Sequence, residues 1–386
     1  MTPDQQKVLE EKKLTLLKAC HHLETDYIPN FSHCANAILD YAGVSFSEAE
    51  ADEEKCKHVF SKLLGDMRLD VGMLNYSGWP LTHETLGGRT ETFLAPDGVT
   101  LQHLQQPIMG ADEYPLFMED LDGFIKNVLL PRKYPALFED KEAAMTSLKI
   151  VASEAASRLT GHYSKVRQMA CEEHGFLPLP IAISRFRHPA DYIFDRFRGF
   201  AGTLSDIRRK PAEFKAAVDK IYYERTEHFL DVGVTDDFVT YMPHLAPYLN
   251  YSQFMFFFWP YFERIAYNLA LSGNRVYMSL ENRWLPFIDT FLDLPHGTVV
   301  AMADDDDIFE LNKIIGYKQI LTGGVLLQNT RLLPVEKNID YAKRVIDECA
   351  PGGGFLFNSN KAWVCKGDIN QTLVDVYNFA HDYGRK

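Results

Sequence analysis

Three side chains suited to proton transfer or metal binding stand at the ends of short apolar runs in the second half of the chain. These are His244, Glu281 and Asp304. Imidazole and carboxylate groups act as acids and bases near neutral pH, and they are also ligands of Zn²⁺. Any one of the three is as readily a loop residue or a helix cap. Together, we expect them to form a catalytic cluster that works by acid–base chemistry or holds a zinc ion.

Asp304 opens a run of four aspartates that ends at Asp307. Four adjacent carboxylates cannot all take part in catalysis. Asp306 or Asp307 is placed to cap the helix that we predict from Ile308, because a carboxylate accepts hydrogen bonds from the free N–H groups of a helix start. Asp304 lies nearest the preceding apolar run and is therefore the candidate for the site.

Other polar and aromatic residues are candidates for substrate binding. Asp70 lies inside an apolar pattern, and a buried carboxylate needs a partner or a function. Arg185 follows a predicted strand and would either hold an anionic group or pair with surface carboxylates. Asn358 ends the last apolar run. Aromatic residues that could form an apolar wall are Tyr76, Trp79, Phe186 and Trp284.

The elements that must position these residues alternate between strand-like and helix-like segments from about residue 237 to residue 360. Such alternation predicts βα units and a parallel sheet. The fold class that fits best is α/β, a (β/α)8 TIM barrel, in which the loops after the strands build one active face. The predicted strands are 238–242, 275–280, 298–302, 319–322 and 354–357, and the predicted helices are 252–271, 285–292, 308–315 and 335–349.

The first half of the chain adds an N-terminal helical extension at 4–23 and a strand at 68–74 that includes Asp70. A β-hairpin is predicted at about 88–107, because Pro96, Asp97 and Gly98 have the chemistry of a tight turn. We expect one barrel domain over residues 1–386 with this hairpin as an insertion.

Two smaller signals remain open in their interpretation. The glycine pair at 323–324 and the glycine triplet at 352–354 permit either close approach of a ligand or a tight turn, and neither matches a phosphate-binding fingerprint. His33 next to Cys34 could be a thiol–base pair, but adjacent side chains diverge, so a structural role is expected.

Composition limits the classes of function. The chain has 386 residues and a net charge of −13, which argues against nucleic acid as a main partner because phosphate binding depends on Lys and Arg. The six cysteines are scattered without a Cys-x-x-Cys pair, as in reduced proteins. The polar start at 1–13 has no signal-peptide pattern, and no apolar run is long enough for a membrane span. We expect a cytoplasmic protein without a membrane partner.

The chain resembles the uroporphyrinogen decarboxylase-like superfamily, and within it the corrinoid-dependent methyltransferases, the O-demethylase components. The resemblance spans most of the chain and is strongest after about residue 190. It rests on the order and spacing of several motifs: Leu16–His22 with Asp26–Pro29, Ser252–Phe254 with Trp259–Tyr261, Leu294–Gly297, Asp307–Phe309 and Ala350–Phe355. It implies a (β/α)8 barrel with its site at the C-terminal ends of the strands.

Two departures from the family narrow what the resemblance implies. The decarboxylases grip their acidic porphyrinogen with arginines after the first strand, whereas residues 30–34 contain none. The thiol-activating methyltransferases hold zinc with a His-x-Cys pair and a later Cys, and the matching positions here are Met278, Leu280 and Asn360. Both porphyrinogen decarboxylation and methyl transfer to a thiol are therefore disfavoured.

The remaining implication is transfer of a methyl group from a methoxylated small molecule to the Co(I) corrinoid (cobalamin) of a partner protein. In this scheme His244, Glu281 and Asp304 form the acid or zinc site, and the aromatic residues named above form the wall. Two alternatives stay open: a decarboxylase of a small carboxylic acid or a porphyrinogen-like substrate, gripped by Arg185 and Arg187, and a ligand-binding barrel without catalysis. Homodimers are common in the superfamily.

Overall fold

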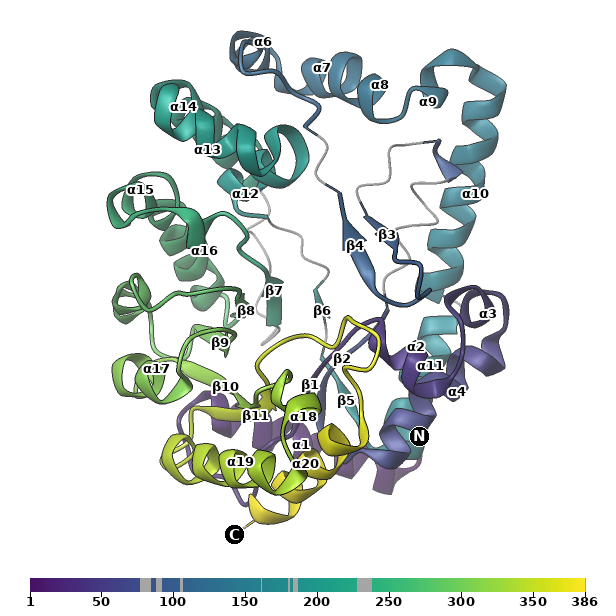
Figure 1. The fold of residues 1–386 in the computed structure, drawn as a ribbon, viewed down its shortest axis with the longest axis vertical. Helices are drawn as coiled ribbons and strands as arrows, with labels where there is room; N and C mark the ends of the chain where they lie inside the picture. Colours follow the sequence, from purple (N-terminus) through teal and green to yellow (C-terminus); the bar gives the residue numbers. More distant parts are fainter. Residues whose placement is uncertain are drawn as a thin grey trace.

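The computed structural model describes residues 1–76, 85–87, 92–104, 107–160, 162–179, 181–182, 187–227 and 238–385. Parallel strands lie at the centre, and helices surround them on the outside (Figure 1). The strands are β1 (Phe31–Cys34), β2 (Val71–Leu74), β3 (Thr92–Leu94), β4 (Leu101–His103), β5 (Leu177–Pro178), β6 (Ile181–Ala182), β7 (Phe238–Tyr241), β8 (Arg275–Leu280), β9 (Val299–Ala303), β10 (Ile320–Val325) and β11 (Phe355–Ser359).

The central strands form two parallel sheets, where the sequence predicts one closed ring. One sheet has the order β1-β2-β5 and the other the order β11-β10-β9-β8-β7-β6. The sheets adjoin in two places. A parallel bridge pairs Asn30 with Phe357, beside β1 and within β11, and the segment from Leu177 to Ala182 supplies β5 to one sheet and β6 to the other. The α/β class with parallel strands is thus confirmed.

The described helices include those that alternate with the strands of the second half of the chain, as expected of βα units. They are α1 (Pro3–Cys20), α2 (Ala37–Ala42), α3 (Phe46–Ala51), α4 (Glu53–Asp66), α6 (Tyr114–Glu119), α7 (Leu121–Phe124), α8 (Leu130–Lys133), α9 (Ala136–Glu139), α10 (Lys141–Thr160), α11 (His162–His174), α12 (Pro189–Ile193), α13 (Gly199–Arg209), α14 (Pro211–Ile221), α15 (Tyr251–Phe257), α16 (Trp259–Leu271), α17 (Ile308–Ile315), α18 (Asn329–Leu332), α19 (Val335–Cys349) and α20 (Gln371–Tyr383). Short π-helical turns are η1 (Ile125–Leu129), η2 (Phe194–Arg198) and η3 (Tyr222–Thr226), and 3₁₀ turns are η5 (Ala246–Tyr248) and η6 (Ile288–Asp293).

Side-chain caps explain where several helices begin. Thr2 and Gln5 form a reciprocal capping box at the start of α1, and Asn250 and Gln253 form one at the start of α15. Asp307 accepts a hydrogen bond from the backbone N–H of Phe309 at 2.8 Å, so it is Asp307 rather than Asp306 that caps α17.

A small apolar cluster, separate from the main core, is built by side chains of both sheets. Its members come from β1, β2 and β7 to β11, together with Leu179 and with Leu16, Ala19 and Cys20 of α1. The backbone N–H of Gly354, just before β11, donates to the carbonyl of Ala19 at 2.8 Å. Helix α1 therefore closes the N-terminal ends of the strands, which leaves the C-terminal ends for a site.

Some element boundaries differ from the predicted ones. The helix expected at 252–271 is divided into α15 and α16, because Pro260 in the first turn of α16 lacks a backbone N–H. The segment expected as an α-helix at 285–292 is instead the 3₁₀ turn η6. Asp70 precedes β2 and does not lie within it.

Glycine is required at two places in the strands. Gly72 in β2 has φ +147°, and a Cβ there would lie 2.3 Å from the carbonyl oxygen of Ser32 in β1. Gly324 in β10 has φ +133°, and a Cβ would lie 2.5 Å from the ring of Phe357. The glycine pair at 323–324 thus belongs to the strand itself, where it allows close packing.

The predicted hairpin is present as antiparallel strands β3 and β4, in which Phe93 pairs with Gln102. It lies between helix α10 and the central strands (Figure 1). Asp97 accepts hydrogen bonds from the N–H groups of Val99 and Thr100 and so forms the tight turn. Among the helices in the described ranges, none combines the length and the apolar character that crossing a membrane requires.

Candidate active site

His244 is held by a charged network at the C-terminal end of β7. Its Nδ1 lies 2.8 Å from Oδ1 of Asp195 in η2, and the other oxygen of Asp195 is paired with the guanidinium of Arg187. The His244 side chain is 35% exposed, whereas that of Asp195 is 15% exposed. The ring is therefore anchored at Nδ1 and open at Nε2.

Asp191, one turn before Asp195, fixes the loop that carries His244. One carboxylate oxygen of Asp191 accepts the N–H groups of His244 at 3.3 Å and of Leu245 at 2.7 Å. The other oxygen accepts the hydroxyl hydrogen of Tyr241, the last residue of β7. Because Asp191 is fully buried, these contacts determine the path of the loop and the position of the His244 ring.

The surrounding charges keep His244 protonated. Burial alone favours the neutral ring, but the hydrogen bond and charge of Asp195, with the charges of Glu281 and Asp191, outweigh burial and raise the pKa of His244 to about 9. Burial would raise the pKa of Asp195, but its contacts with His244 and the charges of Arg187 and Arg196 lower it. The two residues thus form an imidazolium–carboxylate pair at neutral pH.

Glu281 follows β8 directly and faces the open nitrogen of His244. Its Oε2 lies 3.9 Å from Nε2 of His244, just beyond hydrogen-bond distance, and its side chain is 44% exposed. Burial raises the pKa of Glu281, His244 opposes this rise, and Asp304 and Asp195 add to it. A carboxyl group with a raised pKa next to an imidazolium is suited to passing protons.

Asp304 is tied to the loop after β8. Its Oδ2 accepts the N–H of Asn282 at 3.2 Å, and its Oδ1 pairs with the ammonium of Lys361 at 2.8 Å. Asn282 has φ +67°, a conformation that non-glycine residues rarely adopt and that concentrates at functional sites. Burial raises the pKa of Asp304, and Lys361 opposes the rise.

The structure therefore brings His244 and Glu281 into proximity and places Asp304 beside the loop that follows Glu281. Within the described ranges, no three His, Cys, Asp or Glu side chains are arranged so that they could hold a metal ion. The three predicted zinc ligands are therefore not gathered around one point, and Asp304 is paired with Lys361.

Asp70 lies at the other end of the strands. It precedes β2, accepts the backbone N–H of Asn30 at 3.0 Å and pairs with Lys12 of α1 at 3.0 Å. Glu281 follows the C-terminal end of its strand, and the strands are parallel, so the two carboxylates are at opposite ends. The partner that a buried carboxylate needs is Lys12, and Asp70 is not brought to the cluster.

The predicted aromatic wall is not seen at the two positions that the structure describes. Trp284 is fully buried among Phe254, Phe287 and Phe291, and its indole N–H donates to the carbonyl of Glu281 at 3.0 Å. Tyr76 is 4% exposed and stacks on Phe60. Both side chains pack in the core, and Trp284 supports the backbone at Glu281. Trp79, Arg185 and Phe186 lie outside the described residues.

Asn358 is buried inside the strands, where its Nδ2 lies 3.4 Å from the hydroxyl of Tyr277. Sequence reasoning missed Asp191 and Asp195, which lie on a helix and not at a strand end. Their spacing of four residues places both carboxylates on one helical face, and this spacing is the signal that could have found them. Arg187, predicted to bind a carboxylate substrate in the decarboxylase alternative, forms an ion pair with Asp195.

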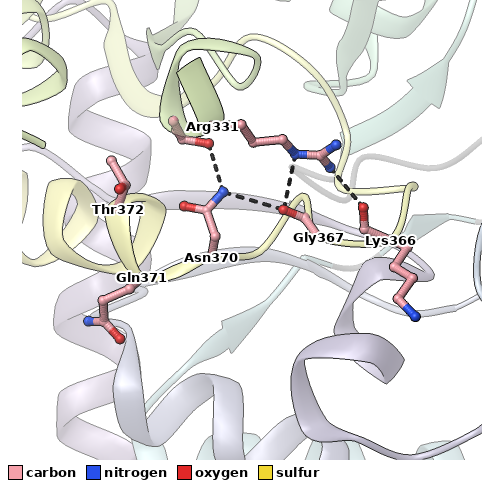
Figure 2. Close-up of a pocket in the computed structure, with 7 residues that line it drawn as sticks. Arg331, Lys366, Gly367, Asn370, Gln371 and Thr372 are labelled. Atoms are coloured by element: carbon pink, nitrogen blue, oxygen red, sulfur yellow. Dashed lines mark hydrogen bonds between the residues drawn. The ribbon is translucent and has the colours of Figure 1, made fainter. Parts of the chain in front are cut away.

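A pocket of about 460 Å³ lies elsewhere, at the start of α20 (Figure 2). It lies between α18 and the loop before α20, and none of its lining residues is a predicted site residue. Arg331 donates there to the carbonyls of Gly367 and Lys366 and pairs with Asp368. The guanidinium of Arg331 is thus already paired within the protein, with Asp368 and two backbone carbonyls. The lining residues are Thr330, Arg331, Lys366, Gly367, Asn370, Gln371 and Thr372.

No protein-family model and no curated protein matches this chain. Among solved structures, the chain is similar to a methyltransferase from Methanosarcina mazei. The two share 15% identity and a TM-score of 0.59, over 96% of this chain and 98% of the other. Similarity at this level of identity shows a common fold over nearly the full length of both chains, and the activity must be argued from the site.

Proposed function

We propose that this protein is a methyltransferase that moves a methyl group from a methoxylated aromatic compound to the corrinoid of a partner protein. We further infer that its two sheets act as one (β/α)8 barrel with the site at the C-terminal mouth. The observation that carries the proposal is the His244–Asp195 pair, an acid with one nitrogen anchored and the other open beside Glu281. The fold shared with a methyltransferase adds support.

The reaction needs an acid because an aryl ether oxygen is a poor leaving group. The reduced corrinoid of the partner supplies the nucleophilic electron pair that accepts the methyl group. As the bond from carbon to oxygen breaks, its electrons go to the oxygen, and Nε2 of His244 donates a proton to that oxygen. General acid catalysis of this kind contributes on the order of 10²–10⁴-fold.

The neighbouring residues prepare His244 for this step and restore it. Asp195 orients the ring through Nδ1 and stabilises its charge, as in other His–carboxylate pairs. Glu281 lies next to Nε2 and its raised pKa suits it to returning a proton. Asp304, which is paired with Lys361, holds the loop after Glu281 by accepting the backbone N–H of Asn282. Its carboxylate also adds negative charge near Glu281.

The test is methyl transfer by the purified protein with a reduced corrinoid carrier and a panel of methoxyaromatics. The absorbance change of the corrinoid on methylation reports the reaction. Turnover with at least one methoxyaromatic supports the proposal. Silence across the panel, together with release of carbon dioxide from a small aromatic or aliphatic acid, would instead favour a decarboxylase.

A further inference from the structure

A chain of uncharged polar groups crosses the apolar interior of the strands. The hydroxyl of Tyr277 in β8 lies 3.2 Å from Nδ1 of His33 in β1 and 3.4 Å from Nδ2 of Asn358 in β11. Tyr277 and Asn358 are fully buried, and His33 is 5% exposed. Tyr277 shares its cluster with Phe31 and Met302, which places these groups among side chains that come from both sheets.

The direction of each hydrogen bond in this chain can be assigned. The backbone N–H of Ser359 donates to Oδ1 of Asn358 at 2.8 Å, so Nδ2 of Asn358 is the atom that faces Tyr277 and donates to it. The hydroxyl hydrogen of Tyr277 then goes to Nδ1 of His33 or to the sulfur of Met302 at 3.1 Å. A neutral imidazole nitrogen is the stronger acceptor.

His33 therefore carries its ring hydrogen on Nε2. Burial lowers the pKa of His33 to about 4, so the ring is neutral at pH 7. None of the described residues forms a hydrogen bond with Nε2. Among the described residues, the buried polar atoms that lack a hydrogen-bond partner do not include Nε2 of His33, so this nitrogen is open to solvent and a ligand oxygen can reach it.

The position of this donor suits a ligand that also reaches the acid. Tyr277, Ser279 and Glu281 alternate along one face of β8 and its extension, so Glu281 lies about 13 Å beyond Tyr277 at the usual rise of a strand. Thr240, which pairs with Tyr277 in register, is only half-buried. A substrate that contacts both His33 and His244 would therefore carry polar substituents at opposite ends of its ring.

The groups at this level favour an uncharged ligand atom. His33, Tyr277, Ser279, Thr322 and Asn358 carry no charge. The nearest cation along β8, Arg275, lies two residues toward the closed end and bonds to Nε2 of His21 at 2.9 Å. Burying an ionised carboxylate without a cation is costly, so a phenol or carbonyl oxygen is preferred.

We propose that Nε2–H of His33 donates a hydrogen bond to an uncharged oxygen substituent of the substrate ring, on the side opposite the methyl-bearing oxygen. Tyr277 and Asn358 act through His33 as positioning residues, because they set which ring nitrogen holds the hydrogen. The assignment of a methylated aromatic substrate rests on the proposed function. The hydrogen-bond direction does not depend on it.

Nitrogen NMR of the ¹⁵N-histidine-labelled protein tests the assignment directly. We expect the His33 signal to be that of the Nε2–H tautomer throughout the neutral range, and Tyr277→Phe to release this preference. Adding 4-methoxyphenol is expected to shift the Nε2–H signal, whereas 4-methoxybenzoate leaves it unchanged. An Nδ1–H tautomer, or equal shifts with both compounds, overturns the proposal.

Two substitutions provide a matched pair. His33→Gln keeps an N–H near the position of Nε2, whereas His33→Asn places its amide near Nδ1 and lacks that donor. We expect His33→Asn to bind 4-methoxyphenol roughly three- to tenfold more weakly and His33→Gln to restore most of the affinity. Equal affinity for wild type and His33→Asn overturns the proposal. Binding through His33 without any methyl transfer overturns only the proposed function.

Discussion

His244 holds its proton under conditions in which an exposed histidine has lost it, because the charges of three nearby carboxylates raise its pKa. Asp195 contacts Nδ1, Glu281 lies near Nε2, and Asp191 is bound to the backbone of the same loop. Arg187 is paired with Asp195, and Arg196 adds a second positive charge near that carboxylate. A charged, anchored ring with one open nitrogen is the arrangement that a general acid needs.

Replacing Asp195 should move the pH at which activity is lost. The acid form of His244 is present below its pKa of about 9, so turnover of the wild type should fall as the pH rises through that value. Asp195→Asn removes the anion that stabilises the imidazolium. The descending limb of the rate profile should therefore shift to lower pH, which steady-state rates across the pH range measure. An unchanged limb would exclude this pairing as the source of the shift.

Replacing Glu281 should affect turnover more than substrate affinity. Glu281→Gln cannot return a proton to His244 and removes one of the charges that raise its pKa. We expect turnover to fall by at least about 10²-fold, the lower end of general acid–base contributions. Glu310→Gln in α17, at an exposed pair with Lys313, is the control. Unaltered turnover of Glu281→Gln on the true substrate would remove Glu281 from this role.

At the scale of elements, the loop after β7 depends on one buried carboxylate. Asp191 accepts hydrogen bonds from two backbone N–H groups and one hydroxyl. Asp191→Ala leaves these donors without an acceptor and should lower the free energy of unfolding by about 1–3 kcal/mol. Urea denaturation measures this change. Loss of activity is expected as well, and full activity would show that the loop does not need this anchor.

The close approach of β1 and β2 makes a second prediction at this scale. Gly72→Ala meets both an unfavourable φ and the carbonyl of Ser32, whereas Gly43→Ala at the end of α2 has a positive φ but open space. We expect Gly43→Ala to cost about 1–2 kcal/mol, the penalty of the left-handed conformation alone. Gly72→Ala should cost clearly more. Equal unfolding midpoints for the two variants would contradict the packing described for these strands.

Sequence patterns located elements better than they located contacts between elements. Strand β8 and helices α17 and α19 have the predicted boundaries, because each is a short apolar run or a strongly amphipathic segment. The helix expected at 285–292 is a 3₁₀ turn. There the buried Asp306 accepts the N–H of Leu285 at 3.1 Å and that of Trp284. A tertiary hydrogen bond of this kind leaves no local signal.

At the scale of the whole molecule, the chain order determines which residues meet. The end of β7 is packed against the helical segment of Asp191 and Asp195, so the partners of His244 come from the preceding unit and not from the strand ends. The prediction of a site at the strand ends named His244 and Glu281, which lie close together, but it did not name Asp191 and Asp195. Asp70, predicted as a substrate-binding residue, instead contacts Asn30 and Lys12 at the N-terminal end of β2.

The similarity to a methyltransferase fold extends over nearly the whole chain, and the described residues place an acid at the open end of the strands. These two observations are independent, since the fold comparison does not depend on the pKa of His244. The proposed function joins them, because a methyl ether must be protonated as it is cleaved. In the proposed function, the partner protein would present its corrinoid at the same open end.

The most direct measurement of this account is the single-turnover rate of corrinoid methylation by the wild type and by His244→Gln, with a methoxyaromatic donor. The account predicts that the wild type methylates the corrinoid and that His244→Gln is slower by at least about 10²-fold, with donor binding retained. A rate in His244→Gln equal to that of the wild type, or no methylation by the wild type with any donor, would contradict it.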